Sequence, residues 1–328
     1  MACAARAEPT QAELQAMKAS YERPKVVPFP KNNPFSPAKL ALGQQLFYDT
    51  RLSGNGAMSC ASCHNQPHAW GDGLPTGVGS KGNRLGRRSP TILNLAWAEL
   101  LFWDGRADTL EDQALGPIQN PDEMNQTLPA LVADLNKTPA YKKAFAAAFP
   151  GEAIAPDTIA KAIATFERTV VSGTAPFDRW IEGDESAIDA SAKRGFVVFN
   201  TTGHCAACHS SWRFTDDSFQ DIGMRSSDKG RGAVIEGVAQ LSFAFKTPGL
   251  RNVAERAPYM HDGSIATLDD VVAHYVDGFV RRPSLSPEIH ILPLTERDRA
   301  DLVAFLKTLS SPDSKASGPN LSTGDKKS

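Results

Sequence analysis

The feature that most constrains this chain is a five-residue pattern that occurs twice. Residues 60–64 read CASCH and residues 205–209 read CAACH, so two copies of C-x-x-C-H use four of the five cysteines in the sequence. Two thiols at this spacing can each bond to one vinyl group of a haem, while the adjacent histidine binds the iron. The repeat therefore predicts two covalently bound c-type haems. The haem-binding residues would be Cys60, Cys63, His64, Cys205, Cys208 and His209.

Other uses of these cysteines explain less of the pattern. A thioredoxin-like motif would follow a strand and would have no use for the histidine. A zinc site shared by the two cysteine pairs would not need a histidine at the same offset twice, and a disulfide within C-x-x-C is strained. Cys3 lies outside both motifs. We expect it to be the remainder of an export signal, with a lipid-anchored cysteine as the alternative.

Composition and charge exclude several other classes of protein. Hydrophobic residues make up 41% and charged residues 22% of the 328 residues, and the formal net charge is −2. This is typical of a folded globular protein rather than a disordered chain. Binding of nucleic acid needs a surplus of basic residues, so we expect no such partner. No apolar run approaches the roughly 18 residues that cross a membrane, so we expect no transmembrane segment. For the oligomeric state, the sequence is compatible with both a monomer and a homodimer.

The two motifs have similar lead-ins, which indicate an internal repeat. An apolar helical pattern at 42–47 and another at 194–199 each end shortly before a motif, with glycine-containing turns between them. Strand signals are few. We therefore predict a mainly α fold of two cytochrome c-like haem domains with long loops. The predicted units are an N-terminal extension (1–30), a first domain (31–181), a second domain (182–310) and a flexible tail (311–328). Further helices are predicted at 110–115, 128–135, 139–148, 156–171, 268–275 and 295–309.

Four strings outside the motifs carry a family resemblance. They are FWDGR at 102–106, GPIQNPDEM at 116–124, TPGLRNV at 247–253 and APYMHDGS at 257–264. With these strings, residues 30–310 resemble the bacterial di-haem cytochrome c peroxidase/MauG family. The resemblance implies one haem in each domain. The haem on His64 would react with peroxide, and the haem on His209 would be six-coordinate and would pass electrons.

The resemblance also assigns roles near the first haem. Trp103 matches a family tryptophan that lies between the two haems and couples them. Glu123 matches a distal acid that moves a proton between the oxygens of peroxide, while Gln113 and Pro117 match supporting positions of the same catalytic site. Many family members carry a histidine ligand of this haem at a position that falls near Ser80, where this chain has none. We therefore expect an open, five-coordinate first haem, with His68 as an alternative ligand.

The second axial ligand of the C-terminal haem distinguishes branches of the family. Tyr275 matches a position that is methionine in the peroxidases proper and tyrosine in MauG-like proteins. A thioether ligand raises the haem potential, whereas a phenolate stabilises ferric and higher-valent iron. We expect His64, His209 and Tyr275 to be the iron ligands, with His274 and Met260 as alternatives to Tyr275.

A calcium ion between the domains is a further expectation from the resemblance. In the family it is bound by an asparagine side chain and two backbone carbonyls. The carbonyl positions match Arg256 and Pro258. The asparagine position matches Arg88, a cation where an oxygen ligand is needed. Calcium stays an open expectation, for which water and Asn83 would supply oxygens.

These expectations together predict a periplasmic di-haem c-type peroxidase of MauG-like type, because covalent haem attachment in bacteria normally follows export. It would use hydrogen peroxide to form high-valent iron and oxidise a Trp or Tyr side chain of a partner protein by long-range electron transfer. Trp212, near the second motif, would be a surface exit for electrons or a packing residue. One alternative is a peroxidase that removes hydrogen peroxide with electrons from a small cytochrome or cupredoxin. The other is a non-catalytic di-haem electron carrier.

Overall fold

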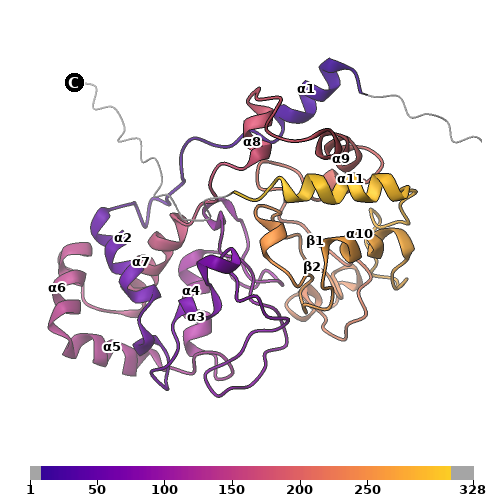
Figure 1. The fold of residues 1–328 in the computed structure, drawn as a ribbon. Coiled ribbons are helices and arrows are strands. Elements are labelled where there is room, and N and C mark those ends of the chain that lie inside the picture. The colour runs from indigo at the N-terminus through magenta and orange to yellow at the C-terminus, as the bar shows by residue number, and fades with distance from the viewer. Residues whose placement is uncertain (1–8, 312–328) are drawn as a thin grey trace, which may run out of the picture.

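The computed structural model describes residues 9–311, which form two helical regions connected by long loops (Figure 1). Cys3 and the predicted tail from residue 312 onward lie outside the described residues. The helices are α1 (Gln11–Ala19), α2 (Pro37–Phe47), α3 (Cys60–Cys63), α4 (Leu110–Gln119), α5 (Leu128–Lys137), α6 (Pro139–Ala148), α7 (Pro156–Arg168), α8 (Pro176–Ile181), α9 (Ala190–Asn200), α10 (Leu268–Asp277) and α11 (Glu296–Lys307). Strands β1 (Phe219–Gln220) and β2 (Phe245–Lys246) form a short antiparallel pair.

The predicted mainly α fold is confirmed, and local sequence explains where most helices begin. A serine, threonine or aspartate precedes the first turn, and its side-chain oxygen accepts a hydrogen bond from a backbone N–H of that turn. The capping residues of this kind are Thr10, Ser36, Thr109, Thr127, Asp189, Thr267 and Thr295. The sequence did not predict α1, which lies in the N-terminal extension.

Each helical region is built on one pair of closely packed helices, α2 with α7 and α9 with α11. A glycine makes the close approach possible in both pairs. A Cβ atom at Gly43 would lie 1.9 Å from the carbonyl oxygen of Ala162, and one at Gly195 would lie 1.9 Å from that of Asp301. The two pairs are therefore structurally equivalent, as the internal repeat in the sequence predicts.

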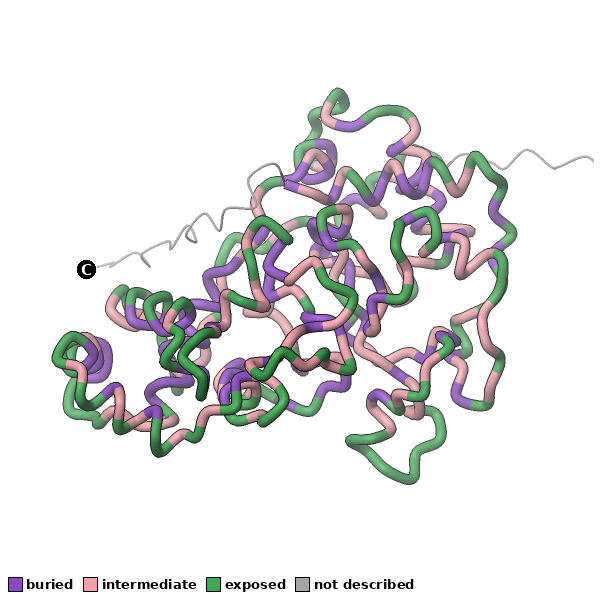
Figure 2. The backbone as a smooth tube through the Cα atoms, turned by 60° about the horizontal axis from the view of Figure 1, so that its bottom comes forward, coloured by how far each residue is buried: buried purple, intermediate pink, exposed green. Residues whose placement is uncertain are grey.

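The structure contains two main hydrophobic cores, and Figure 2 shows buried backbone running through the interior of both regions. The first core ends at Val170 in sequence order. The second includes Phe177 and Trp180 of α8 together with Tyr21, which follows α1. By packing, the chain thus passes from the first core to the second between Val170 and Phe177. The domain division near residue 182 stays a prediction.

The glycine contacts predict a specific loss of stability. Gly43→Ala should destabilise the haem-loaded protein by about 1–3 kcal/mol, because the added methyl group meets a backbone carbonyl that cannot move aside. Gly86→Ala is the matched control, since a Cβ atom there would meet nothing within 4 Å. Urea unfolding followed by circular dichroism measures both. Equal stability of Gly43→Ala and the wild type would contradict the close packing of α2 on α7.

Candidate active site

Both C-x-x-C-H motifs open into one cavity of about 1080 Å³, which is lined by residues of both helical regions. Most of the lining is apolar, as a site for a large planar cofactor requires. The structure brings nearly all of the predicted site residues together here. The predicted residues that line the cavity are Cys60, Cys63, His64, Trp103, Gln113, Pro117, Glu123, Cys205, Cys208, His209, Arg256 and Tyr275. Pro258 and His68 are not among the lining residues.

The two motif histidines are held in the same way. The Nδ1 atom of His64 donates a hydrogen bond to the carbonyl of Trp70 at 3.2 Å, and Nδ1 of His209 donates to that of Phe214 at 2.9 Å. Both acceptor residues have a positive φ, 62° and 58°, which turns their carbonyls back toward the rings. This bond fixes the tautomer and leaves Nε2 as the atom that can bind a metal. Burial also lowers the pKa of both histidines, so each is the neutral imidazole that iron requires.

The cysteines fit haem attachment better than the other uses considered. None of the four is in a disulfide. Burial raises the pKa of Cys63 and of Cys208 to about 11, which is the opposite of the low thiol pKa of a thioredoxin-like motif. Within residues 9–311, no group of three or more His, Cys, Asp or Glu side chains is placed to hold a metal ion. The donor set of two cysteines and one histidine at each motif fits two covalent haems.

Glu123 is a half-buried acid in the wall of the cavity. Its Oε2 atom is buried without a hydrogen-bond partner among the described residues, and burial raises its pKa. The backbone N–H of Ser80 donates to the carbonyl of Glu123 at 2.7 Å, so the loop that contains Ser80 lies beside this residue. His68, the alternative ligand of this haem, is exposed and does not line the cavity.

Tyr275 faces the second motif from α10. Burial raises its pKa, and the charges of Cys205 and Cys208 raise it further, which places the phenol close to both thiols. His274 is turned elsewhere, because its Nε2 atom bonds to the carbonyl of Ile222 at 2.8 Å. Met260 also lines the cavity.

Trp103 is held by both helical regions. Its ring Nε1–H donates to the carbonyl of Arg88 at 2.9 Å, and its own carbonyl accepts a hydrogen bond of 2.8 Å from the backbone N–H of Lys246 in β2. The ring therefore lies at the junction of the regions that carry His64 and His209.

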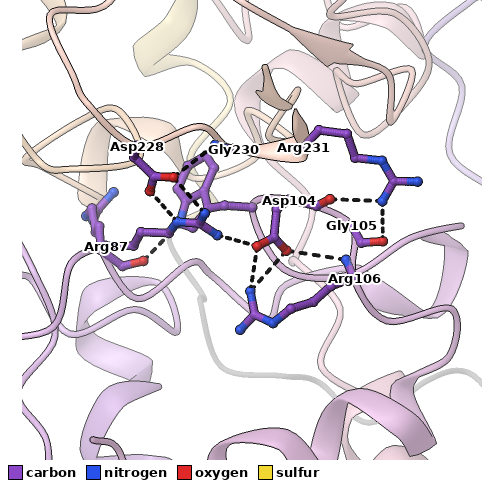
Figure 3. Close-up of polar contacts among 9 residues, drawn as sticks. Arg87, Asp104, Gly105, Arg106, Asp228, Gly230 and Arg231 are labelled. Atoms are coloured by element: carbon purple, nitrogen blue, oxygen red, sulfur yellow. Dashed lines mark hydrogen bonds and ion pairs between the residues drawn. The ribbon is translucent and has the colours of Figure 1, made fainter. Parts of the chain in front are cut away.

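A cluster of ion pairs surrounds Asp104, the residue that follows Trp103 in the sequence, and Figure 3 shows the cluster. Asp104 binds Arg87 at 2.6 Å and Arg106 at 2.9 Å, and Arg87 also binds Asp228 of the second region at 2.6 Å. Arg231 donates to the backbone carbonyls of Asp104 and Gly105 at 2.9 and 2.5 Å. Because Arg87 and Arg231 each connect segments of both regions, the cluster holds the two regions in register around Trp103.

Comparison with known proteins identifies the family. Residues 37–186 match the model of the family "Di-haem cytochrome c peroxidase", and residues 192–310 match that of "Cytochrome c". The methylamine utilization protein MauG of Methylorubrum extorquens is 50% identical over 98% of this chain and 92% of its own length. The chain belongs to the di-haem cytochrome c peroxidase/MauG family.

Two further relatives agree with this assignment. The cytochrome c551 peroxidase of Pseudomonas aeruginosa is 36% identical over 89% of this chain and 84% of its own length. A crystal structure of a MauG-like protein associated with microbial copper homeostasis superposes with a TM-score of 0.82, at 34% identity over 90% of this chain and 96% of that chain. The protein is thus an oxidoreductase of the di-haem peroxidase class with c-type haems.

The structure corrects one expectation about tryptophan. Trp212 is not a surface residue: it is only 8% exposed and packs edge-to-face against Trp97 with 4.8 Å between ring centroids. Of the two roles considered for it, packing is the one the structure supports.

Glu167 is a buried acid in the cavity wall that the sequence patterns did not indicate. It lies on α7, is 4% exposed, and its Oε2 atom has no partner among the described residues. The internal repeat could have revealed it. Phe166 packs on Gly43 in the first helix pair, and Phe305 packs on the equivalent Gly195 in the second. The residues that follow them, Glu167 and Leu306, are therefore equivalent, and both line the cavity. A carboxyl group thus stands in the first region where the second has a leucine.

Glu167 predicts a pH-dependent stability. Burial raises its pKa from 4.5 to about 8; the charge of Glu111 raises it further, and Arg168 opposes the shift. The folded protein therefore binds this proton more tightly than the unfolded chain, and stability falls as pH rises from 4.5 through 8. Glu167→Gln should remove this loss, which amounts to a few kcal/mol. Urea unfolding of the haem-loaded proteins at pH 5.5, 7 and 9 measures it, with exposed Glu22→Gln as the control. Parallel pH profiles for wild type and Glu167→Gln would contradict a buried, protonated carboxyl.

Proposed function

We propose that this protein is a periplasmic, MauG-like peroxidase that reduces hydrogen peroxide at the His64 site and oxidises a Trp or Tyr side chain of a partner protein. The observation that carries the proposal is the pairing of two different groups in one cavity. The carboxyl group of Glu123, whose Oε2 atom is buried without a hydrogen-bond partner among the described residues, lies in the first region, and the phenol of Tyr275 faces the second motif. An electron carrier would need neither a distal acid nor an accessible site.

The chain divides the chemistry between cofactor and side chains. When bound, the haems supply iron centres that accept and donate the two electrons exchanged with peroxide. The chain supplies protons and positions. Glu123 takes a proton from one oxygen of peroxide and returns it to the other as the O–O bond breaks, so that this oxygen leaves as water. A raised pKa favours this role, because the group must both gain and release a proton near neutral pH.

The surroundings of Glu123 keep the peroxide site accessible. Gln113 and Pro117 lie on α4 and line the cavity beside it. The loop 77–82, which contacts Glu123 through Ser80, contains no histidine that could occupy the open side of the iron. The resting protein would therefore react with peroxide without prior reduction.

Trp103 and Tyr275 would connect this site to the partner protein. Trp103 bridges the two regions and gives electrons a path between the haems. Tyr275 would bind the second iron as phenolate. Burial raises the pKa of Tyr275, so the phenolate needs a cation in direct contact, and ferric iron is such a cation. The positive charges of Arg88 and Arg256 in the cavity wall disfavour calcium between the regions, so calcium has no part in this proposal.

The partner and the compartment follow from the family and from the cofactor. A protein substrate is favoured over a small electron donor because Tyr275 stands where the peroxidases proper have methionine. Export to the periplasm is the usual route to covalent haem attachment in bacteria. No helix within residues 9–311 is long and apolar enough to cross a membrane. Monomer and homodimer remain open predictions.

The role of Glu123 predicts a kinetic defect. Glu123→Gln should lower the second-order rate constant for reaction with hydrogen peroxide by about 10²–10⁴-fold, because an amide cannot transfer the proton. Stopped-flow absorbance measures the rate, and exposed Glu236→Gln is the control. The electron paramagnetic resonance (EPR) spectrum of the resting protein should stay unchanged. A rate equal to that of the wild type would remove Glu123 from the mechanism.

The role of Tyr275 predicts a spectroscopic change. The resting protein should show one high-spin and one low-spin ferric haem in its EPR spectrum. Tyr275→Phe should convert the low-spin signal to high-spin, because phenylalanine provides no ligand, while exposed Tyr48→Phe should leave it intact. If the low-spin signal survives in Tyr275→Phe, another residue, such as Met260, ligates this haem. Two low-spin signals in the wild type would favour the electron carrier.

A further inference from the structure

Two arginines in the cavity wall have no role in the mechanism above. Arg88 and Arg256 are 8% and 7% exposed, and both line the cavity. Burial of a charged guanidinium costs several kcal/mol unless an anion or enough hydrogen-bond acceptors compensate. Two such groups in one wall therefore need a partner.

The described residues do not supply that partner. No ion pair to Arg88 or Arg256 is formed within residues 9–311, and the Nε atom of each is buried without a hydrogen-bond acceptor. Arg256 donates only from Nη2, to the carbonyl of Gly249 at 2.5 Å. Asp72 attracts Arg88 from a distance, but its carboxylate already binds Ser89 Oγ and the N–H of Leu74.

The two cations are close enough to repel one another. Burial lowers the pKa of Arg256 to about 10, and the charge of Arg88 is the next largest cause. Burial also lowers the pKa of Arg88. A phenol, Tyr259, interacts with both guanidinium groups and is itself protonated at neutral pH, since burial raises its pKa. The wall between these groups therefore carries an uncompensated positive charge.

The pair lies between the two haem motifs. A Cβ atom at Gly71, in the turn that follows His64, would be 3.9 Å from Nη2 of Arg88. Arg256 is near the other motif, because its charge lowers the pKa of His209. The backbone of Arg88 also holds Trp103 through its carbonyl. One guanidinium thus stands on each side of the junction between the regions.

We propose that Arg88 and Arg256 form a carboxylate-binding pair that receives propionate groups of the two haems and takes the place of a divalent cation between the helical regions. Each haem brings two carboxylates into this cavity, and these anions need the positive charge that the wall provides. Arginine suits the task because its planar donors can bind a carboxylate in bidentate fashion. The inference rests on the c-type haems and is independent of the peroxide chemistry.

The same residues do not fit calcium. Calcium takes six to eight oxygen ligands, mostly carboxylates and carbonyls. Here a guanidinium group replaces the expected asparagine, and the side chain of Arg256 adds a second positive charge beside its own carbonyl. Two positive charges in the same buried wall repel a further cation placed between them. The expectation of calcium that the resemblance raised is therefore replaced by fixed cations of the chain itself.

Potentiometric titration of the haem-loaded protein tests the pair. A fixed positive charge beside a haem stabilises the reduced iron, so Arg88→Gln should shift the potential of the His64 haem to a more negative value. Arg256→Gln should do the same to the His209 haem. Arg88→Lys keeps the charge and should retain most of the wild-type potential, which separates charge from packing. Exposed Arg225→Gln is the control. Unchanged potentials in both Gln variants would overturn the proposal.

Elemental analysis and titration with phosphate test whether calcium or a free anion, rather than the propionates, occupies the site of the arginine pair. Purified wild type should contain two irons and no calcium by elemental analysis, and a chelator should leave its EPR spectrum unchanged. One calcium ion per chain, or a spectral change on chelation, would overturn the replacement of calcium. Added phosphate should not shift the haem potentials, since propionates already occupy the pair. A saturable shift with phosphate would mean that a free anion binds there instead. None of these readouts depends on activity with peroxide.

Discussion

The wall of one cavity contains ionisable side chains with buried atoms that have no hydrogen-bond partner among the described residues, among them Glu123, Glu167, Arg88 and Arg256. Such groups oppose folding unless something in the cavity compensates them. Burial raises the pKa of both acids, and the pKa of about 8 for Glu167 lets that group lower the cost by holding a proton at neutral pH. The two arginines stay charged at neutral pH and need anions. The cavity wall is thus complementary to haems, which carry iron at the centre of the porphyrin ring and carboxylates at its edge.

The relation between the two helical regions matters as much as either region alone. Trp103 is hydrogen-bonded to Arg88 on one side and to Lys246 on the other. The ion pairs of Asp104, Arg87 and Asp228 prevent the regions from sliding past each other at this point. A small displacement there would move the tryptophan relative to both motif histidines. In the proposed function, electron transfer between the two sites would therefore depend on contacts that bind neither haem directly.

Much of the fold and of the site could be predicted from sequence because the signals are local. The C-x-x-C-H motifs are five residues long, and the helix that begins after Thr295 is specified by its own capping box. The family strings then indicated Trp103 and Glu123, and the wider resemblance indicated Tyr275; all three line the cavity. Their individual roles stay predictions that the experiments above test.

What could not be predicted depends on contacts between distant segments. Tyr21 packs in the second core against Phe177 and Phe214, which no local pattern indicates. Trp212 is covered by Trp97 from the other region, so its proximity to the second motif in sequence suggested an exposure that it lacks. Glu167 follows an ordinary helical pattern and becomes notable only once the equivalence with Leu306 is visible. The sequence showed that Arg88 does not suit a calcium site. It did not show that the side chain of Arg256 lies in the same cavity wall.

The central claim is that the two haem sites share oxidising equivalents through Trp103. Rapid-freeze EPR after one equivalent of hydrogen peroxide tests it most directly, because the high-spin and low-spin ferric signals report the two sites separately. Both signals should decrease at the same rate in the wild type, and the low-spin signal should lag behind in Trp103→Phe. Loss of the high-spin signal alone in the wild type, with the low-spin signal unchanged, would contradict the claim.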